Sequence, residues 1–161
     1  MVKLFINIVL WIITLPIITA AITPVKNNLG IAVVVPVKLT WDMMFKVLLV
    51  EKYSKKYGMT INVPEFDYSL QQLNRKEVIV YGYVIPTAVD GNSFVLSKTP
   101  FSSCYFCGNG GVETVMTIKY KGKAPRYKTD DYIALKGIFE LNSTDINELI
   151  YVLNNAIEVK Q

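Results

Sequence analysis

Histidine is absent from this chain of 161 residues, and that absence removes several classes of function. Without an imidazole the chain has no general base with an ordinary pKa near neutrality, which excludes serine triads and histidine-assisted thiol proteases. Metal sites that depend on histidine ligands are excluded for the same reason. A hydrolase built on this sequence would have to use carboxylates, lysine or an unassisted thiol.

Charge is also scarce, because charged residues make up 19% of the chain against 52% hydrophobic residues. The apolar fraction is ample for a folded core and argues against disorder. The net charge is +4, and the basic residues are scattered along the chain, so we expect no nucleic-acid partner. About 140 residues would remain after removal of a leader, which is enough for one ordinary domain.

Residues 1–21 have the pattern of a secretory signal peptide. Lys3 provides a positive start, residues 4–18 are almost wholly apolar, and small residues predict cleavage after Ala21. An uncleaved anchor is the alternative, because the apolar run is about long enough to cross a bilayer. In both cases we expect the rest of the chain to be exported, either periplasmic or anchored in the inner membrane and facing the periplasm. This segment is its only expected contact with the membrane.

Residues 22–75 predict a lead-in with one helix near residues 40–50. Thr40 can cap that helix, and Asp42 would lie in its first turn, where the helix dipole favours an acidic side chain. We expect Trp41 to pack on the domain that follows.

Residues 76–161 predict a domain that is mainly β with minor α. Strands are expected at residues 77–85, 93–97, 112–120, 132–141 and 149–160, with a short helix starting at Thr144 or Asp145. Gly82 and Gly137 lie inside two long strands, and glycine inside a strand is typical of a sheet that bends sharply. The pattern favours a small OB-like five-stranded barrel. The alternative is an open α+β sheet with the Trp41 helix on one face.

Three aromatic residues, Tyr81, Tyr83 and Phe94, lie in these strands. On a barrel face they could stack the bases of a single-stranded nucleic acid. Their spacing fits inward core positions equally well, and we expect them in the core.

The two cysteines of the chain, Cys104 and Cys107, are separated by two residues. One interpretation is a structural disulfide, which fits an exported protein, although so small a loop would add only about 2 kcal/mol. A second is a redox-active pair, but Pro100 precedes it and a glycine-rich loop follows, so the helix dipole that usually activates such a pair is missing. A third is half of a tetrahedral site for zinc or copper.

A metal site would need auxiliary ligands, and the nearest carboxylates in the sequence are Glu113, Asp130 and Asp131. A second chain's cysteines in a homodimer would also complete it. The glycines that follow the pair are expected to let the backbone turn with positive φ and so support the loop. They are Gly108, Gly110 and Gly111.

Three short motifs occur in order along the chain: W-D at Trp41-Asp42, G-Y-x-x-P at residues 82–86, and C-x-F-C-G at residues 104–108. With this pattern the chain resembles a family of uncharacterised exported bacterial proteins. The resemblance covers about residues 40–157 and implies an exported, distantly OB-like domain. It is also similar to OB-like envelope domains found beside transporters, some of them associated with metal handling. The run at residues 109–112 departs from the Gly-Ala-Gly-Pro-like run of that pattern.

Three functions are therefore open. The first is a periplasmic binding or accessory protein of the cell envelope, working with a transporter or assembly complex and holding a soft metal through Cys104 and Cys107. The second is a thiol-disulfide redox protein that uses the same pair. The third is a purely structural module whose loop is pinned by a disulfide. A non-enzymatic role is favoured.

Overall fold

The computed structural model describes residues 35–85 and 92–160. The signal segment lies outside these ranges. The apolar run at residues 31–35 predicts an edge strand and Asp90-Gly91-Asn92 predicts a turn, and both lie mostly outside these ranges as well.

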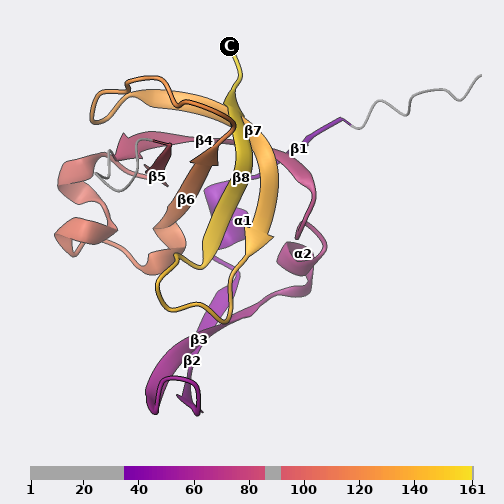
Figure 1. Cartoon of the computed structure of the whole chain (residues 1–161), viewed down its shortest axis with the longest axis vertical. Coiled ribbons are helices and arrows are strands. Elements are labelled where there is room, and N and C mark those ends of the chain that lie inside the picture. The colour runs from indigo at the N-terminus through magenta and orange to yellow at the C-terminus, as the bar shows by residue number, and fades with distance from the viewer. Residues whose placement is uncertain (1–34, 86–91, 161) are drawn as a thin grey trace, which may run out of the picture. The chain divides into compact units, whose positions relative to one another are not determined.

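Five strands close into a barrel (Figure 1). They are β4 (Glu77–Ile85), β5 (Ser93–Ser97), β6 (Val115–Tyr120), β7 (Tyr132–Leu141) and β8 (Tyr151–Glu158). The strand order is β4-β5-β6-β8-β7, and β7 pairs back onto β4, so the sheet closes on itself. Strands β6 and β8 run parallel, and the other barrel neighbours are antiparallel. This arrangement confirms the predicted small OB-like barrel and excludes the open sheet.

Two glycines allow neighbouring barrel strands to approach closely. A Cβ atom at Gly82 would lie 2.7 Å from the carbonyl oxygen of Ser97 and 2.8 Å from Cγ of Leu96. A Cβ atom at Gly137 would lie 2.8 Å from the carbonyl oxygen of Asn154, where the pairing of β7 with β8 also shifts its register. Both glycines thus mark tight places in the barrel wall, as their positions inside strands predicted.

The core is built from alternate residues of the barrel strands. In residues 77–84 of β4 the even-numbered positions are buried and the odd-numbered ones are half-buried, so Tyr81 and Tyr83 lie on the outer surface. Tyr83 packs there against Tyr132, with ring centroids 4.9 Å apart. Phe94 alone of the three aromatic residues is in the core. The expectation that all three are core residues is wrong for the two tyrosines, because strand alternation puts them opposite the buried positions.

Tyr151 and Phe139 are the largest fully buried side chains of the core. Their ring centroids are 5.7 Å apart. The Tyr151 hydroxyl donates a hydrogen bond to the carbonyl of Met44. The core thereby holds the segment that precedes the barrel strands.

The elements before the barrel are short. They are β1 (Val37–Lys38), which pairs parallel with β4, and the helices α1 (Trp41–Met44) and α2 (Tyr68–Gln71). The Trp41 indole donates to the carbonyl of Tyr81 at 2.7 Å, so Trp41 does pack on the barrel. The helix predicted near residues 40–50 is wrong in its second half. Thr40 caps it as expected, but it ends after one turn because the next residues pair as a strand.

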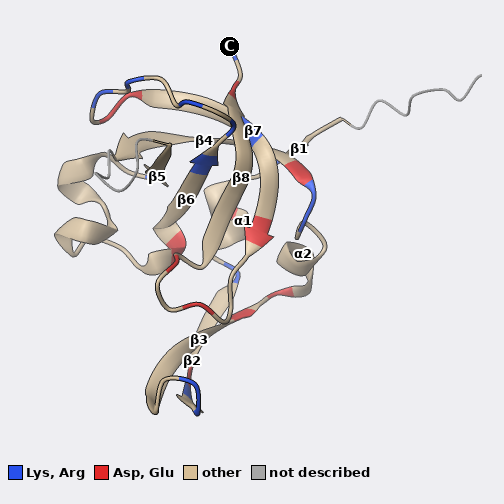
Figure 2. Ribbon diagram, viewed as in Figure 1, with Lys and Arg blue, Asp and Glu red and all other residues tan. Residues whose placement is uncertain are grey.

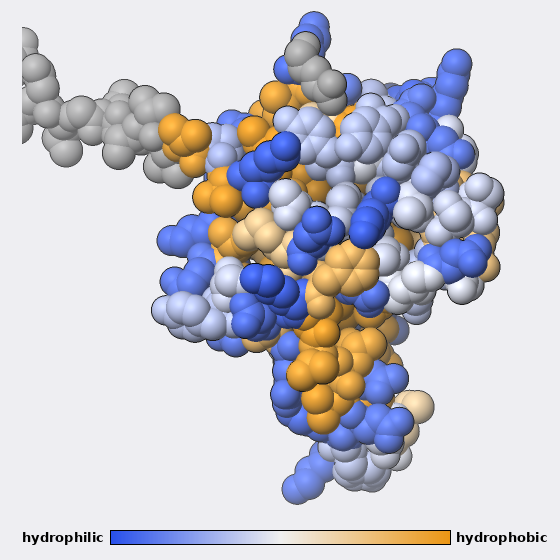
Figure 3. Space-filling model, turned by 180° about the vertical axis from the view of Figure 1, so that it is seen from behind, coloured by the Kyte–Doolittle hydropathy of each residue, from blue (hydrophilic) through white to orange (hydrophobic). Residues whose placement is uncertain are grey.

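That strand belongs to a two-stranded hairpin, β2 (Val47–Ser54) with β3 (Met59–Phe66), which projects from the barrel (Figure 1). Gly58, with φ of +66°, supports the turn at its tip. Apolar side chains gather on the hairpin surface (Figure 3). Leu48 is 69% exposed, Tyr53 68% and Met59 54%. From the sequence alone, a strand is predicted in this region only at residues 59–63.

Lysine and arginine are scattered over the described chain, including the turn of the hairpin and the loop before β7 (Figure 2). None of the helices within residues 35–85 and 92–160 is long and apolar enough to cross a membrane.

Candidate functional site

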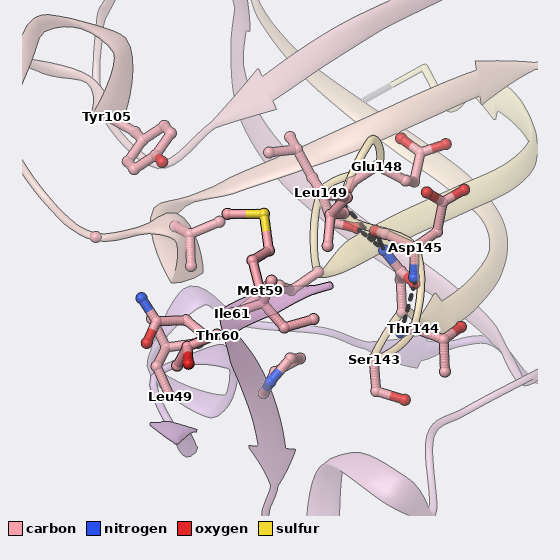
Figure 4. A pocket seen from close by; sticks show the side chains of 17 residues that line it. Leu49, Met59, Thr60, Ile61, Tyr105, Ser143, Thr144, Asp145, Glu148 and Leu149 are labelled. Carbon is pink, nitrogen blue, oxygen red and sulfur yellow. Dashed lines mark hydrogen bonds between the residues drawn. The ribbon is translucent and has the colours of Figure 1, made fainter. Parts of the chain in front are cut away.

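A cleft lies between the hairpin and the loop that joins β7 to β8. This cleft has a volume of about 580 Å³. Leu49, Met59 and Ile61 line it from the hairpin, residues 142–146 and 148–150 line it from the loop, and Tyr105 lines it from the cysteine segment (Figure 4). Met59 points its thioether into this space (Figure 4). One wall is therefore apolar and the other is mainly loop backbone and polar side chains.

The hairpin wall is fixed at both of its ends. At the base, Pro64 is buried and the ring of Phe66 lies 5.8 Å from that of Tyr151. Near the tip, the Tyr57 hydroxyl donates to the carbonyl of Thr144 at 3.4 Å. The tip thus reaches across to the opposite wall, so the cleft is bounded at its outer end.

Asn142 organises the loop wall. Its side-chain amide donates to the carbonyls of Asp145 at 2.7 Å and Glu148 at 3.1 Å. Its side-chain oxygen accepts from the backbone N–H groups of Thr144 and Asp145. The helix predicted to start at Thr144 or Asp145 is wrong, because this side chain satisfies backbone groups that a helix would otherwise pair. The wall is a preformed loop.

Two carboxylates of the loop stay ionised at the edge of the cleft. Burial alone would raise the pKa of Glu148, but the ion pair with Lys119 at 2.6 Å and several hydrogen bonds outweigh it and lower the pKa. The backbone N–H of Asn147 donates to the Asp145 carboxylate at 3.0 Å and lowers the pKa of Asp145. The loop side of the cleft therefore carries negative charge, part of it neutralised by Lys119.

The two cysteines occupy different environments. Cys104 is buried beside Ile85, Val95 and Val115 at one end of the barrel. Cys107 is exposed and donates its S–H to the carbonyl of Phe101 at 3.0 Å. Both thiols are free. The pair therefore pins its loop to the barrel through one buried sulfur. A prediction from the sequence that both sulfurs lie at the outer rim of the barrel is wrong for Cys104.

The thiol chemistry of this pair is not that of an activated nucleophile. Desolvation of the sulfur and then the neighbouring Cys104 thiol raise the pKa of Cys107. A raised pKa lowers the thiolate fraction, which opposes rapid thiol exchange. The segment forms two turns of 3-10 helix, η1 (Phe101–Ser103) and η2 (Tyr105–Cys107). Neither is long enough to supply a helix dipole of consequence.

The carboxylates proposed as auxiliary metal ligands serve other contacts. Asp130 accepts from the backbone N–H of Phe101 at 2.7 Å, and Asp131 accepts from the N–H of Lys128 at 2.7 Å. Glu113 folds back so that its carboxylate lies against Gly111. Within residues 35–85 and 92–160 no three Cys, Asp or Glu side chains come together as a metal site would require. The two thiols remain half of such a site.

Two of the three glycines that follow the cysteine pair have the positive φ expected of them. Gly108 has φ of +81° and Gly110 has φ of +106°, both in the left-handed region that favours glycine. Gly111 has an ordinary φ of −90° and precedes η3 (Val112–Thr114). The reversal made by the first two returns the chain to the barrel and leaves Tyr105 facing the cleft.

The hairpin wall of this cleft, formed by β2 and β3, is not among the elements predicted from the sequence. Its signal was the polar turn Lys55-Lys56-Tyr57-Gly58 between two apolar runs, which is typical of a hairpin.

Among solved structures, the chain is similar to a crystal structure of a DUF3299 family protein from Pseudomonas aeruginosa PAO1. The TM-score is 0.50 and the sequence identity 11%, over 79% of this chain and 98% of that one. At this identity the likeness concerns the fold alone. No family model and no curated protein matches the sequence. The family resemblance drawn from the W-D, G-Y-x-x-P and C-x-F-C-G motifs stays a prediction.

Proposed function

We propose that this chain is an exported binding module of the bacterial cell envelope, and that it holds an apolar group of its ligand or partner in the cleft. The cleft between the hairpin and the loop at residues 142–150 is the observation that carries the proposal. Its volume of about 580 Å³ lies within the range of natural ligand sites, which are mostly apolar with a few placed polar groups.

The place of the cleft in the fold supports this role. The loop at residues 142–150 joins the fourth and fifth strands of the barrel, and OB-folds carry a ligand-binding loop at that position. Asn142 holds this loop in one conformation before any ligand arrives, which reduces the ordering cost of binding. In this proposal the cysteine segment serves as part of the wall, through Tyr105. The partner is expected to be a component of an envelope transport or assembly system.

The binding test compares two adjacent leucines of β2. Leu49 lines the cleft, whereas Leu48 lies on the opposite face of the hairpin and does not. The neutral apolar dye Nile red serves as the probe, titrated into the full chain and followed by fluorescence. We expect Leu49→Asn to weaken dye binding by roughly tenfold and Leu48→Asn to leave it nearly unchanged. Equal effects of the two substitutions, or no saturable binding, would contradict the proposal.

Export is tested separately. Alkaline phosphatase fused after Gln161 is active only beyond the inner membrane, so we expect an active fusion in cells. Mass spectrometry of the exported chain is expected to give Ile22 as the first residue if the signal peptide is cleaved after Ala21. An inactive fusion would place the domain in the cytoplasm and overturn the exported role, whatever the dye experiment shows.

A further inference from the structure

The hairpin β2–β3 has two free strand edges, and each is long enough to pair with a strand of another molecule. Each strand has eight residues, and neither pairs with any other strand within residues 35–85 and 92–160. An isolated two-stranded sheet is marginal in water, and an exposed apolar edge is a template for another strand. Leu48 and Tyr53 on β2 are among the most exposed apolar side chains described.

The hydrogen-bond pattern shows which groups point outward from this hairpin. The register pairs residues whose numbers sum to 113, such as Val50 with Val63. At the base, the N–H of Asp67 donates to the carbonyl of Lys46, so the even-numbered residues of β2 bond inward to β3. Because the bonds of antiparallel strands alternate, the odd-numbered residues of β2 turn their N–H and C=O groups to the free edge.

The same alternation distinguishes the two edges. Pro64 lies opposite Leu49, an outward-facing position, so the free edge of β3 lacks a donor in its half nearer the base. Proline at an edge is a common device against strand pairing. Strand β2 contains no proline and offers an uninterrupted edge at Val47, Leu49, Glu51 and Tyr53.

We propose that β2 pairs antiparallel with β2 of a second copy of this chain, so that the two hairpins form one four-stranded sheet with a two-fold axis at Val50. The charges on β2 select this register. Because the outward groups are on odd-numbered residues, odd residues of one copy must pair with odd residues of the other. The two-fold axis therefore passes through a residue near the strand centre, which leaves Leu49, Val50 and Glu51. An axis at Glu51 sets this carboxylate opposite itself, and an axis at Leu49 sets Lys52 opposite Lys46 of the other copy.

An axis at Val50 avoids both like-charge contacts, which destabilise a sheet when they are directly opposite. It places Val47 opposite Tyr53 of the other copy, a favourable pairing of a β-branched and an aromatic residue. It also places Leu48 opposite the aliphatic stem of Lys52, whose ammonium group already pairs with Glu65 at 2.7 Å on its own hairpin. Each contact occurs twice, and the exposed leucine and tyrosine of β2 are covered.

The experiment measures the dimer dissociation constant of the full chain by sedimentation equilibrium. Val50→Lys sets two ammonium groups at the axis, and Val63→Lys is its matched control, since both valines are half-buried and share one face of the hairpin. We expect Val50→Lys to raise the dissociation constant at least about tenfold, and Val63→Lys to change it less than about threefold.

Leu49→Pro provides a second variant that removes an outward N–H without removing a bond inside the hairpin. We expect it to dissociate the dimer while circular dichroism stays unchanged. A wild-type chain that is monomeric at every concentration would overturn the proposal and leave the edge for a different partner. Association that survives Leu49→Pro would overturn it as well, since it would arise elsewhere, for example through the N-terminal apolar segment. Neither outcome bears on dye binding in the cleft.

Discussion

Replacing Gly82 by alanine tests whether the barrel wall is as close-packed as the structure shows. The added Cβ would lie 2.7 Å from the carbonyl oxygen of Ser97 and 2.8 Å from Cγ of Leu96, and both neighbours are fully buried. A backbone carbonyl in a paired strand cannot swing away, so β4 and β5 must separate locally. Overpacking of this kind costs about 1–3 kcal/mol.

The unfolded chain offsets part of that cost, because alanine restricts it more than glycine does, by roughly 0.4–1 kcal/mol. We therefore expect Gly82→Ala to lower the free energy of unfolding by about 1–2 kcal/mol and the melting temperature by roughly 5–10 °C. Urea titration followed by circular dichroism measures the first, and calorimetry measures the second.

Gly111→Ala is the matched control. Its φ of −90° suits alanine, and the atoms a Cβ would meet belong to the flexible end of Glu113, which can rotate away. We expect a change within about 0.5 kcal/mol. Equal stability of the two variants would refute the reasoning, because it would mean that β4 and β5 have room for a methyl group.

Three further outcomes follow from the contacts described. In the reduced native protein, iodoacetamide should label Cys107 slowly and Cys104 only after unfolding, as read by mass spectrometry, and equal labelling of both would contradict the burial of Cys104. Trp41→Phe should lower stability in urea by about 1–2 kcal/mol, because the carbonyl of Tyr81 loses its donor; an unchanged urea midpoint would speak against that bond. Burial raises the pKa of Tyr151, so the neutral hydroxyl stabilises the fold fully below pH about 10. That contribution declines above this pH by up to about 1.4 kcal/mol per unit, and Tyr151→Phe should flatten the decline in alkaline urea titrations.

Much of the barrel was predictable because its signals are local. The strands at residues 77–85, 93–97 and 132–141 match β4, β5 and β7, since β-branched and aromatic runs between turns leave few alternatives. Gly82 and Gly137 indicated the tight places in the wall. Strand β6 begins three residues later than expected, because residues 112–114 form a turn of 3-10 helix first.

The hairpin could not be predicted in the same way. Residues 47–54 are compatible with a helix that continues from Trp41 and also with a strand. What decides between them is pairing with residues 59–66, across a turn in which the N–H of Gly58 donates to the carbonyl of Ser54 at 2.8 Å. That pairing is a tertiary effect, and it overrides the capping signal of Thr40 after a single turn.

The candidate site shows the same division. The spacing of Cys104 and Cys107 predicted that the two thiols share one loop, but it could not predict that only one is buried. The sequence predicts Thr144 as a helix cap, but the Asn142 side chain bonds five backbone groups of the loop instead. Side chains that replace secondary structure leave no periodic trace in a sequence.

A closed barrel also explains why both proposals concern the hairpin. Within residues 35–85 and 92–160, closure pairs the barrel strands with one another, whereas β2 and β3 pair only with each other. Strands β2 and β3 keep free edges and also carry exposed apolar side chains, among them Leu48, Tyr53 and Met59. The hairpin lines the cleft with residues 59–62 of β3 and with Leu49, and it turns the outward backbone groups of β2 to its other edge. These two surfaces use different atoms of the same element. A ligand in the cleft and a second copy at the edge can therefore be bound together, and pairing of β2 would stiffen the wall against which the ligand packs.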